Sequence, residues 1–472
     1  MYRSPTNTPT SAKNNTALNL LLKEIAMNKK YSHKCIVGDF NFKDINWENW
    51  STLHDDTKED EQFLKALRDS FFYQHVDEPT RARGISYVTC GRSPVVIVPG
   101  TGGNQLQAKL TGKPSKPAWY CYSTTSSYFT LWLDIKSLLP PAINCWVDNM
   151  RLDWNMKDMT VANSPGVLTR TFDFGQTTSF ETVDTLGLIK YIKPLADYLE
   201  TLGYKRGKDI RGAPYDFRYS PDRQPDHYHL KLRDLIEETY VSNGNTPVTL
   251  LSHSYGCAMS LYFLSIQSQA WKSKYLKQWI PMSGVFAGTK QQVQLYAAGL
   301  LMGVPQAIVN PLTIRGEQRS SISNLYMLPA AKFWSKNDVI ARTKSKTYYI
   351  GDIDQFLIDV GFPQGAIMRK HIVNSTALMD SIPGIPIQCF YGVIKKSTVE
   401  TLEYDGGFPD KFANLIMGDG DGTVNIESLR LCGSFKSKQN ESVTVTEVPN
   451  VDHTAIISDK SVMSKIGQLL QD

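Results

Sequence analysis

The hydrophobic pattern is most informative between residues 246 and 263, which read TPVTLLSHSYGCAMSLYF. Residues 248–251 form a short apolar, partly β-branched run, which predicts a strand covered on both faces. Beyond Gly256 the apolar side chains recur at helical spacing, at Ala258, Leu261, Tyr262 and Leu264. Ser254 is therefore predicted to lie at a tight turn between a buried strand and a helix.

Small residues flank this serine on both sides. With Ser252 and Gly256 it forms S-x-S-x-G, which resembles the nucleophile elbow G-x-S-x-G of α/β-hydrolases, with Ser in place of the first Gly. Small residues are needed there because strand and helix pass close together while the serine hydroxyl projects outward. A plain polar turn after a buried strand is the alternative interpretation.

A nucleophile elbow requires an acid and then a histidine later in the chain. Only His371 and His453 follow Ser254, and Asp421, which opens the Gly-rich loop of IMGDGDGTVN, has only His453 after it. The chain order therefore predicts a triad of Ser254, Asp421 and His453. In such a triad the imidazole removes the serine proton and the carboxylate orients the imidazole.

A second apolar run, residues 95–98, leads into the Gly-rich sequence PGTGGN. A phosphate-binding P-loop would need a lysine after the glycines, and none follows at that spacing. We therefore predict an oxyanion loop, in which the backbone N–H groups of Thr101 and Tyr255 stabilise negative charge on a reacting carbonyl. An ordinary turn from strand to helix is the alternative.

Large apolar side chains are dense between residues 119 and 154, among them Phe129, Leu131 and Trp132. Such residues in one loop either cover a site or meet lipid, or they belong to the core; the sequence leaves both open.

The seven cysteines give a conflicting indication of location. Cys121 and Cys145 bracket one loop and Cys389 and Cys432 bracket another, a spacing typical of two disulfides with three cysteines left over. Disulfides are typical of an oxidising compartment. The first fifteen residues, however, show no basic start followed by an apolar core, so we see no secretory signal.

Composition indicates a globular chain with a large core. The 472 residues are 41% hydrophobic and 11% aromatic, with a net charge of +5. This charge is too small to suggest nucleic-acid binding, although weak attraction to an anionic lipid surface is compatible with it. No apolar run reaches the roughly 18 residues of a membrane span, and residues 293–309, interrupted by Gly and Pro, are expected to be a loop or cover segment.

Two other motifs could suggest metal sites. His227 and His229, in DHYHL, lack an accompanying cluster of ligands, and a solvated turn is predicted for them instead. Asp419 and Asp421 begin like a calcium loop, but Thr423 and Val424 occupy positions where that loop needs another oxygen ligand and a Gly. We expect no metal and no cofactor.

The N-terminal part differs in character from the rest. Its sequence YSHKCIVGDFNFKDINWENW resembles the endonuclease of non-LTR retrotransposons, whose metal site would use Asp39 and Asn41. The resemblance covers about residues 20–84 and lacks the other metal-binding and catalytic residues of that family. We expect an incomplete fragment, or a fusion artefact, without nuclease activity.

The motifs after residue 94 carry a second resemblance. PGTGGNQLQAKL, SYFTLWLD, CWVDNMRL, RGAPYDFRYSP, SHSYG, QAWKSKYL, GDGDGTVN and a final DH occur in this order. Together they resemble the lecithin:cholesterol acyltransferase family, closest to its lysosomal phospholipase A and transacylase branch. The resemblance extends from about Val95 to the C-terminus.

This resemblance implies roles for individual residues. The implied catalytic and oxyanion residues are Ser254, Asp421, His453, Thr101 and Tyr255. The implied disulfides are Cys121–Cys145 and Cys389–Cys432, and the implied lid or substrate-binding residues are Trp132, Phe129 and Leu131. That branch has an acidic residue in place of Thr101 and Met in place of Tyr255, so the pH preference and acyl-chain selectivity need not transfer.

The expected fold is α/β: an α/β-hydrolase of residues 93–472, with a small membrane-binding subdomain and lid elements at about 119–147 and 291–319. A partial α+β endonuclease-like fragment, residues 1–92, would precede it. The resemblance implies cleavage of a fatty acyl ester of glycerophospholipids, with transfer of the acyl group to water or a lipophilic alcohol. It also implies a lysosomal or extracellular location.

The expected partners are a phospholipid membrane surface or lipoprotein and a lipid alcohol acceptor, with no nucleic acid. Two alternatives remain open: a catalytically silent lipid-binding protein, and a metal-dependent nuclease formed by the N-terminal fragment.

Overall fold

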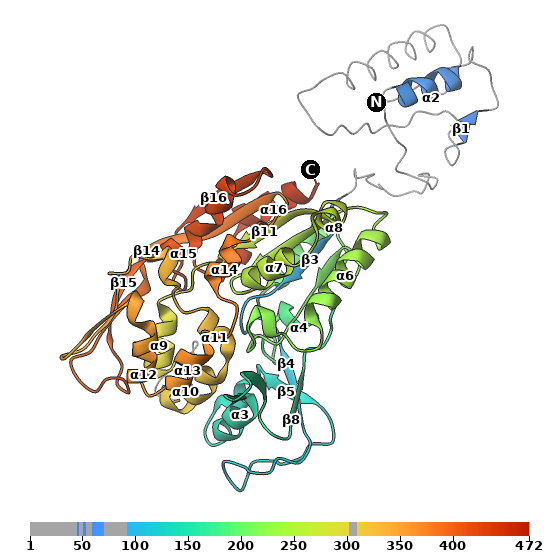
Figure 1. Cartoon of the computed structure of the whole chain (residues 1–472). Helices are drawn as coiled ribbons and strands as arrows, with labels where there is room; N and C mark the ends of the chain where they lie inside the picture. Colours follow the sequence, from blue (N-terminus) through green and yellow to red (C-terminus); the bar gives the residue numbers. More distant parts are fainter. Residues whose placement is uncertain (1–44, 47–50, 53–58, 70–91, 302–308, 472) are drawn as a thin grey trace. The chain divides into compact units, whose positions relative to one another are not determined.

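The computed structural model describes residues 45–46, 51–52, 59–69, 92–301 and 309–471 (Figure 1). The chain divides into two compact units, Met1–Arg92 and Ser93–Leu470. The described elements of the first unit are the antiparallel pair β1 (Ile45–Asn46) and β2 (Ser51–Thr52), and helix α2 (Glu59–Asp69). Asp39 and Asn41 of the endonuclease-like motif lie outside the described residues.

The second unit is built on a mixed sheet of nine strands within its described residues. Neighbouring strands run parallel in the order β16–β14–β11–β10–β3–β9. Their bounds are β3 (Val95–Val98), β9 (Ile210–Gly212), β10 (Val248–His253), β11 (Leu276–Met282), β14 (Ile387–Glu403) and β16 (Val443–Pro449). The predicted strands at 95–98 and 248–251 are thus confirmed, and the second extends two residues further.

Strand β14 is long enough to join two parts of this sheet. Its first half pairs with β11 and β16, whereas its second half pairs in parallel with β12 (Val339–Arg342) and antiparallel with β15 (Asn414–Gly420). The short β13 (Thr347–Tyr349) completes that end by pairing with β12.

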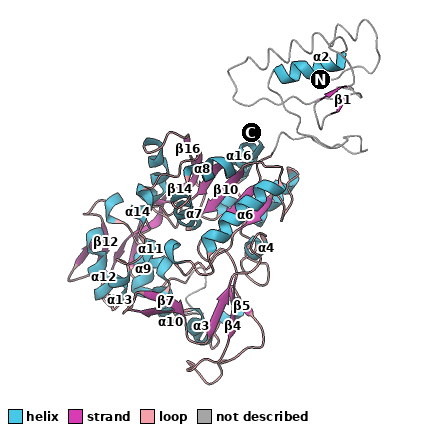
Figure 2. Cartoon of the chain, turned by 45° about the vertical axis from the view of Figure 1, so that its right-hand side comes forward, coloured by secondary structure: helices cyan, strands magenta, loops and turns pink. Residues whose placement is uncertain are grey.

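Helices cover both faces of the parallel strands, because successive strand residues point to opposite faces. In β3, Val95 and Ile97 belong to one hydrophobic layer, and Val96 and Val98 belong to the other. Helices α5 (Lys193–Thr201) and α16 (Lys460–Gln471) pack into the first layer. The second layer receives α6 (Tyr228–Ser242), α7 (Gly256–Ser265) and α8 (Gln269–Tyr275) (Figure 2).

A small subdomain follows the first strand of the sheet. It contains an antiparallel sheet of β4 (Leu106–Leu110), β5 (Phe129–Trp132) and β8 (Val167–Arg170), a hairpin of β6 (Leu152–Asn155) and β7 (Thr160–Asn163), and helix α3 (Ile143–Met150). The sequence left open whether the aromatic loop that ends in β5 is core or an exposed cover, and the structure shows some of its residues buried and others exposed. Leu131 and Trp132 are buried in the core, whereas Trp119 and Tyr122 are exposed by 88% and 76%.

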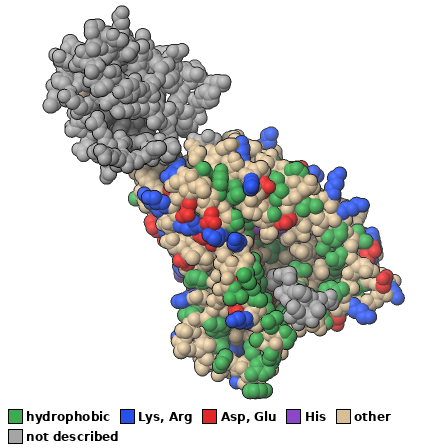
Figure 3. All heavy atoms as spheres, turned by 180° about the vertical axis from the view of Figure 1, so that it is seen from behind, with side chains coloured by type: hydrophobic (Ala, Val, Ile, Leu, Met, Phe, Trp, Pro, Cys, Tyr) green, Lys and Arg blue, Asp and Glu red, His purple; other side chains and the backbone are tan. Residues whose placement is uncertain are grey.

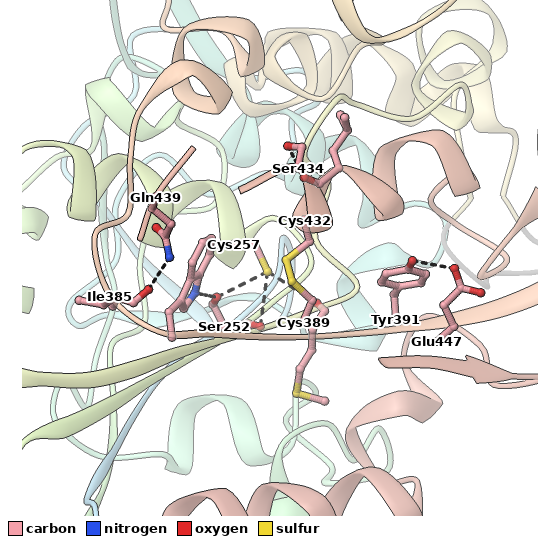
Figure 4. Close-up of a disulfide and its surroundings, with 12 residues drawn as sticks. Ser252, Cys257, Ile385, Cys389, Tyr391, Cys432, Ser434, Gln439 and Glu447 are labelled. Atoms are coloured by element: carbon pink, nitrogen blue, oxygen red, sulfur yellow. Dashed lines mark hydrogen bonds between the residues drawn. A yellow bond between two sulfur atoms is a disulfide. The ribbon is translucent and has the colours of Figure 1, made fainter. Parts of the chain in front are cut away.

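Both expected disulfides are present. Cys121–Cys145 joins the aromatic loop to α3, with 5.5 Å between the Cα atoms. Cys389–Cys432 joins β14 to the 3₁₀ segment Leu431–Ser437, with 6.2 Å between the Cα atoms. Figure 4 shows the buried thiol of Cys257 near this second bridge, where it donates to the carbonyl oxygens of Ser252 and Met282.

The remaining helices lie mainly between β11 and β14 in sequence. They are α9 (Gln291–Ala298), α10 (Pro311–Ser320), α11 (Ile322–Tyr326), α12 (Ile353–Asp359), α13 (Pro363–Met368) and α14 (Ser375–Asp380); the short α4 (Thr178–Glu181) and α15 (Ile426–Arg430) lie outside this region. The expectation of a loop from residue 293 was wrong for α9. This helix ends at Gly299, whose φ of 82° suits glycine and where a Cβ would lie 2.4 Å from the carbonyl oxygen of Pro311.

Helix α10 carries a buried carboxyl group. Glu317 is only 5% exposed and accepts a hydrogen bond from the Ser321 hydroxyl at 3.2 Å. Burial raises the pKa of Glu317 to about 7, although Ser321 and the charge of Arg218 act in the opposite direction. Native Glu317 therefore holds a proton up to nearly neutral pH, whereas the unfolded chain releases it near the ordinary value of 4.5.

Because the native state binds this proton more tightly, Glu317 makes stability fall as the pH rises from about 4.5 to about 7. We expect Glu317→Gln to raise the unfolding free energy by roughly 2–3 kcal/mol at pH 8 and to change it little at pH 4. Chemical denaturation at both pH values measures this, with Asp234→Asn, which changes an exposed carboxyl group on α6, as control. An equal effect at both pH values would contradict the assignment.

Candidate active site

Ser254 lies at a sharp turn between β10 and α7. Its φ of 55° is in the left-handed region, which is uncommon for a residue with a side chain. Its N–H donates to the carbonyl oxygen of Met282, at the end of β11, at 2.9 Å. The turn therefore holds the serine at the carboxyl ends of the central parallel strands.

Close backbone contacts require glycine on both sides of this turn. A Cβ on Gly256 would lie 2.4 Å from the carbonyl oxygen of Pro99, and a Cβ on Gly100 would lie 2.9 Å from the Cβ of Ser254. Ser252 takes the place of the first elbow glycine, and its buried hydroxyl accepts a hydrogen bond from the Trp279 indole at 2.7 Å. The Ser252 side chain, which a glycine would lack, is therefore accommodated by its hydrogen bond with Trp279.

The structure brings the three predicted residues of the triad together. His453 Nε2 lies 2.9 Å from Ser254 Oγ, and His453 Nδ1 lies 2.7 Å from Asp421 Oδ2. The exposed fractions of Ser254, His453 and Asp421 are 5%, 8% and 0%. A neutral imidazole that donates from Nδ1 to the carboxylate can accept the serine proton at Nε2.

Asp421 is held as a charged group although it is fully buried. Burial by itself would raise the pKa of Asp421, but His453 and the N–H groups of Val424 and Thr423 outweigh this effect and lower it. Those two N–H groups donate to Oδ1 at 2.8 and 3.1 Å, and the His453 N–H donates to the Asp421 carbonyl oxygen at 2.8 Å. The Gly-rich loop therefore orients both the carboxylate and the histidine.

The two residues predicted as oxyanion donors flank the serine. Thr101 follows Gly100, which contacts Ser254, and lies in a turn closed by the Gly103 N–H donating to the Gly100 carbonyl oxygen at 3.0 Å. Tyr255 directly precedes α7, and its buried hydroxyl donates to the carbonyl oxygen of Tyr219 at 3.0 Å. The Tyr255 side chain therefore packs in the core, and only the backbone of this residue lies at the turn beside Ser254.

The predicted lid residues occupy different environments. The Trp132 indole donates to the carbonyl oxygen of Gly102 at 2.7 Å, which links β5 to the loop around Thr101. Phe129 is half-buried, and Leu131 is 1% exposed and belongs to the core. Trp132 is therefore the one of these three for which the structure gives a direct contact with the loop at the serine.

The other polar motifs have hydrogen-bond partners of their own. Asp419 accepts a hydrogen bond from the Lys396 N–H at 3.0 Å. His229 lies in the first turn of α6, half-buried against aromatic rings, and its Nε2 is 2.6 Å from the Pro221 carbonyl oxygen, so a solvated turn was the wrong prediction for it. Among the described residues no cluster of three or more His, Cys, Asp or Glu side chains could hold a metal ion.

Sequence reasoning missed two residues that contact this site. His253 directly precedes Ser254, and Tyr191 is 62 residues upstream, yet Tyr191 Oη lies 2.6 Å from His253 Nδ1. For His253 the available signal was its position directly before Ser254, because this places it at the end of the same strand, β10. Nothing in the sequence linked Tyr191 to it.

The parallel sheet, its helical layers and the serine turn define an α/β-hydrolase. One chain in the crystal structure of the Tle4-Tli4 complex has the same fold, with a TM-score of 0.52 and 12% identity over 80% of this chain and 98% of that chain. The family model for lecithin:cholesterol acyltransferase matches residues 128–369 and 361–460.

Three relatives are more similar to this chain in sequence than the chain of that crystal structure is. Lysosomal phospholipase A and acyltransferase of Canis lupus familiaris is 37% identical over 383 residues, covering 80% of this chain and 91% of its own. The Homo sapiens protein of that name is 36% identical, covering 80% and 90%. Phosphatidylcholine-sterol acyltransferase of Mus musculus is 36% identical, covering 80% and 85%. The chain belongs to the lecithin:cholesterol acyltransferase family.

The loop that carries His453 packs closely against β14. This contact gives a test of the geometry of the triad. A Cβ on Gly392 would lie 1.9 Å from the carbonyl oxygen of Val451, two residues before His453. We expect Gly392→Ala to displace this loop and slow fluorophosphonate labelling of Ser254 by about tenfold or more.

Gly351→Ala is the control, because a Cβ there meets nothing within 4 Å. Labelling rates measured at one probe concentration compare the variants. An unchanged rate in Gly392→Ala would show that the nucleophile does not depend on the position of this loop.

Proposed function

We propose that residues 93–472 form a serine-dependent phospholipase A and lipid O-acyltransferase. The single observation that carries the proposal is the continuous hydrogen-bonded chain from Ser254 through His453 to the buried, charged Asp421. Membership of a family whose relatives are named phospholipases and acyltransferases supports the choice of substrate.

The reaction begins with attack of Ser254 Oγ on the carbonyl carbon of a fatty acyl ester of a glycerophospholipid. His453 Nε2 takes the serine proton as the new C–O bond forms, and Asp421 stabilises the imidazolium. The backbone N–H groups of Thr101 and Tyr255 are the proposed donors to the oxyanion. The protonated His453 then donates to the departing oxygen, which releases the lysophospholipid and leaves an acyl ester on Ser254.

The second half of the reaction decides between hydrolysis and transfer. Water or a lipophilic alcohol gives its proton to His453 and attacks the acyl carbonyl, and Ser254 leaves as its proton returns. Both outcomes use the same residues, and the protein's own side chains supply every proton transfer. We propose a calcium-independent activity, whose balance between hydrolysis and transfer depends on which acceptor reaches the acyl group.

The proposed substrate surface is a phospholipid membrane or a lipoprotein. In the described part of the chain no helix is long and apolar enough to span a bilayer. Large apolar side chains are exposed in the small subdomain, where Trp119 and Tyr122 lie on either side of the disulfide-bonded Cys121. On the face of the second unit that Figure 3 shows, hydrophobic patches are interspersed with charged side chains. Such exposed groups favour interfacial contact.

A second exposed apolar loop connects α4 to α5. Leu186, Leu188 and Ile189 are exposed by 57%, 70% and 44%. The buried Asp184 carboxylate accepts hydrogen bonds from their three N–H groups at 2.6 to 3.1 Å, so the turn is held rigid while its side chains face outward. Backbone hydrogen bonds between Leu133 and this loop join it to β5. We propose that both loops contact lipid.

The location that fits this proposal is a lysosome or the extracellular space. Two disulfides are typical of proteins that mature in an oxidising compartment, and relatives of the chain are named as lysosomal enzymes.

Release of labelled acyl chains from mixed liposomes tests the activity. We expect Ser254→Ala to lower total acyl release and acyl transfer by about 10⁴-fold or more, because the acyl-enzyme can no longer form. Liposome binding measured in parallel separates loss of chemistry from loss of contact. If Ser254→Ala retained activity, or if the wild type bound liposomes without releasing acyl chains, a silent lipid-binding protein would be the better assignment.

Replacing one exposed leucine tests the lipid-contacting loop. We expect Leu188→Ser to weaken liposome binding, measured by sedimentation, by about tenfold or more, because burying one such side chain in lipid contributes about 1.5–3 kcal/mol. Hydrolysis of a soluble short-chain ester should be unchanged. Leu230→Ser on α6, a leucine exposed by 60%, is the matched control. Equal binding by all three proteins would exclude this loop from the membrane contact.

A further inference from the structure

A second hydrogen-bonded chain runs beside the triad and involves two residues that the proposed proton transfers do not use. The Gly100 N–H donates to Tyr191 Oη at 2.8 Å, Tyr191 Oη lies 2.6 Å from His253 Nδ1, and His253 Nε2 lies 2.7 Å from the backbone oxygen of His453. This series of hydrogen bonds therefore begins at the predicted oxyanion loop and ends at the backbone carbonyl oxygen of His453, the proposed catalytic base.

The chemistry of its members fixes the direction of each bond. A carbonyl oxygen only accepts, so His253 Nε2 must carry the proton that it donates to His453. Burial lowers the pKa of His253 to about 3, with His453 adding to the effect, so the ring is neutral and its Nδ1 is an acceptor. Burial of the hydroxyl raises the pKa of Tyr191, which therefore keeps the proton that it donates to His253.

Each end of the chain is attached to a different part of the reaction centre. At one end Gly100 precedes Thr101, and at the other end lies His453 itself; between them, His253 directly precedes Ser254. His253 is 2% exposed, and its ring centroid lies 4.8 Å from that of His453. At this distance a second positive charge would oppose the imidazolium that forms during acyl transfer, so a neutral His253 suits the reaction.

Packing around the Tyr191 hydroxyl accounts for two loop glycines. A Cβ on Gly103 would lie 2.7 Å from a ring carbon of Tyr191. A Cβ on Gly100 would lie 3.1 Å from Tyr191 Oη and 3.2 Å from His253 Nδ1. The loop can approach this chain so closely only because these positions have no side chain.

We propose that Tyr191 and His253 are positioning residues that hold the oxyanion loop and the backbone of His453 in fixed relation to Ser254. Neither side chain exchanges a proton with the substrate. Each acts through the groups to which it is hydrogen-bonded, and the inference rests on the acyl-transfer function proposed above.

Tyr191→Phe tests the inference, because it leaves the ring in place and removes the hydroxyl that joins Gly100 to His253. We expect kcat for acyl release to fall by about 10- to 100-fold, as for misplacement of catalytic groups. KM should change by less than about threefold, because the substrate contacts are retained.

Tyr204→Phe is the matched control. Its hydroxyl is also buried and donates to the carbonyl oxygens of Ser93 and Leu470 at 3.2 and 3.3 Å, away from the triad. We expect it to lower Tm about as much as Tyr191→Phe while leaving kcat unchanged. If both variants lost kcat in proportion to Tm, general destabilisation would explain the effect and the inference would fall.

Substitutions of His253 give an independent comparison should Tyr191→Phe fold poorly. A glutamine can still donate from its side-chain nitrogen to the His453 carbonyl oxygen, whereas an alanine cannot. We expect His253→Gln to retain at least about tenfold more kcat than His253→Ala. Equal kcat in these two variants would overturn the role of His253.

Fluorophosphonate labelling of the wild type separates this inference from the proposed function. A wild type that neither reacts at Ser254 nor releases acyl chains would end the function and the inference together. A labelled, active wild type accompanied by Tyr191→Phe with unchanged kcat would leave the function standing and refute only the positioning role.

Discussion

The site depends on a steric constraint at the crossing of two chain segments. Ser254 adopts a left-handed backbone conformation, and the helix behind it passes so close to β3 that a single Cβ on Gly256 would meet the Pro99 carbonyl oxygen at 2.4 Å. Two layers of apolar side chains, one on each face of the parallel strands, hold this crossing in place. The cost of the strained turn is thus met by the surrounding core.

The same crossing brings loops from distant parts of the chain to one point. The Gly-rich segment after β3 lies beside the serine, and the loop after β15 presents Asp421, while β16 leads to His453. Backbone N–H groups hold the Asp421 carboxylate, so a buried negative charge persists next to the imidazole. The Trp132 indole joins the small subdomain to the Gly-rich loop after β3, and Trp119 of the same subdomain faces outward, where we propose that it meets a lipid surface.

Much of this arrangement could be predicted from sequence because it follows local rules. The strands at 95–98 and 248–251 are short apolar runs, and the order of Ser254, Asp421 and His453 left few choices. Helix α9 was missed because its glycine-interrupted surroundings obscured a helix that is buried nearly all round. Tyr191 was missed for a different reason: a hydroxyl that meets His253 across 62 residues depends on tertiary packing, for which the sequence carries no periodic signal.

The central claim is that an acyl group is carried on Ser254 during turnover. The most direct measurement is mass spectrometry of peptides from the enzyme quenched during reaction with a phosphatidylcholine of defined acyl chains. The account predicts a mass increase equal to one acyl group on the peptide containing Ser254, and its disappearance after the substrate is exhausted. Steady acyl release with the acyl group on another residue would contradict the account.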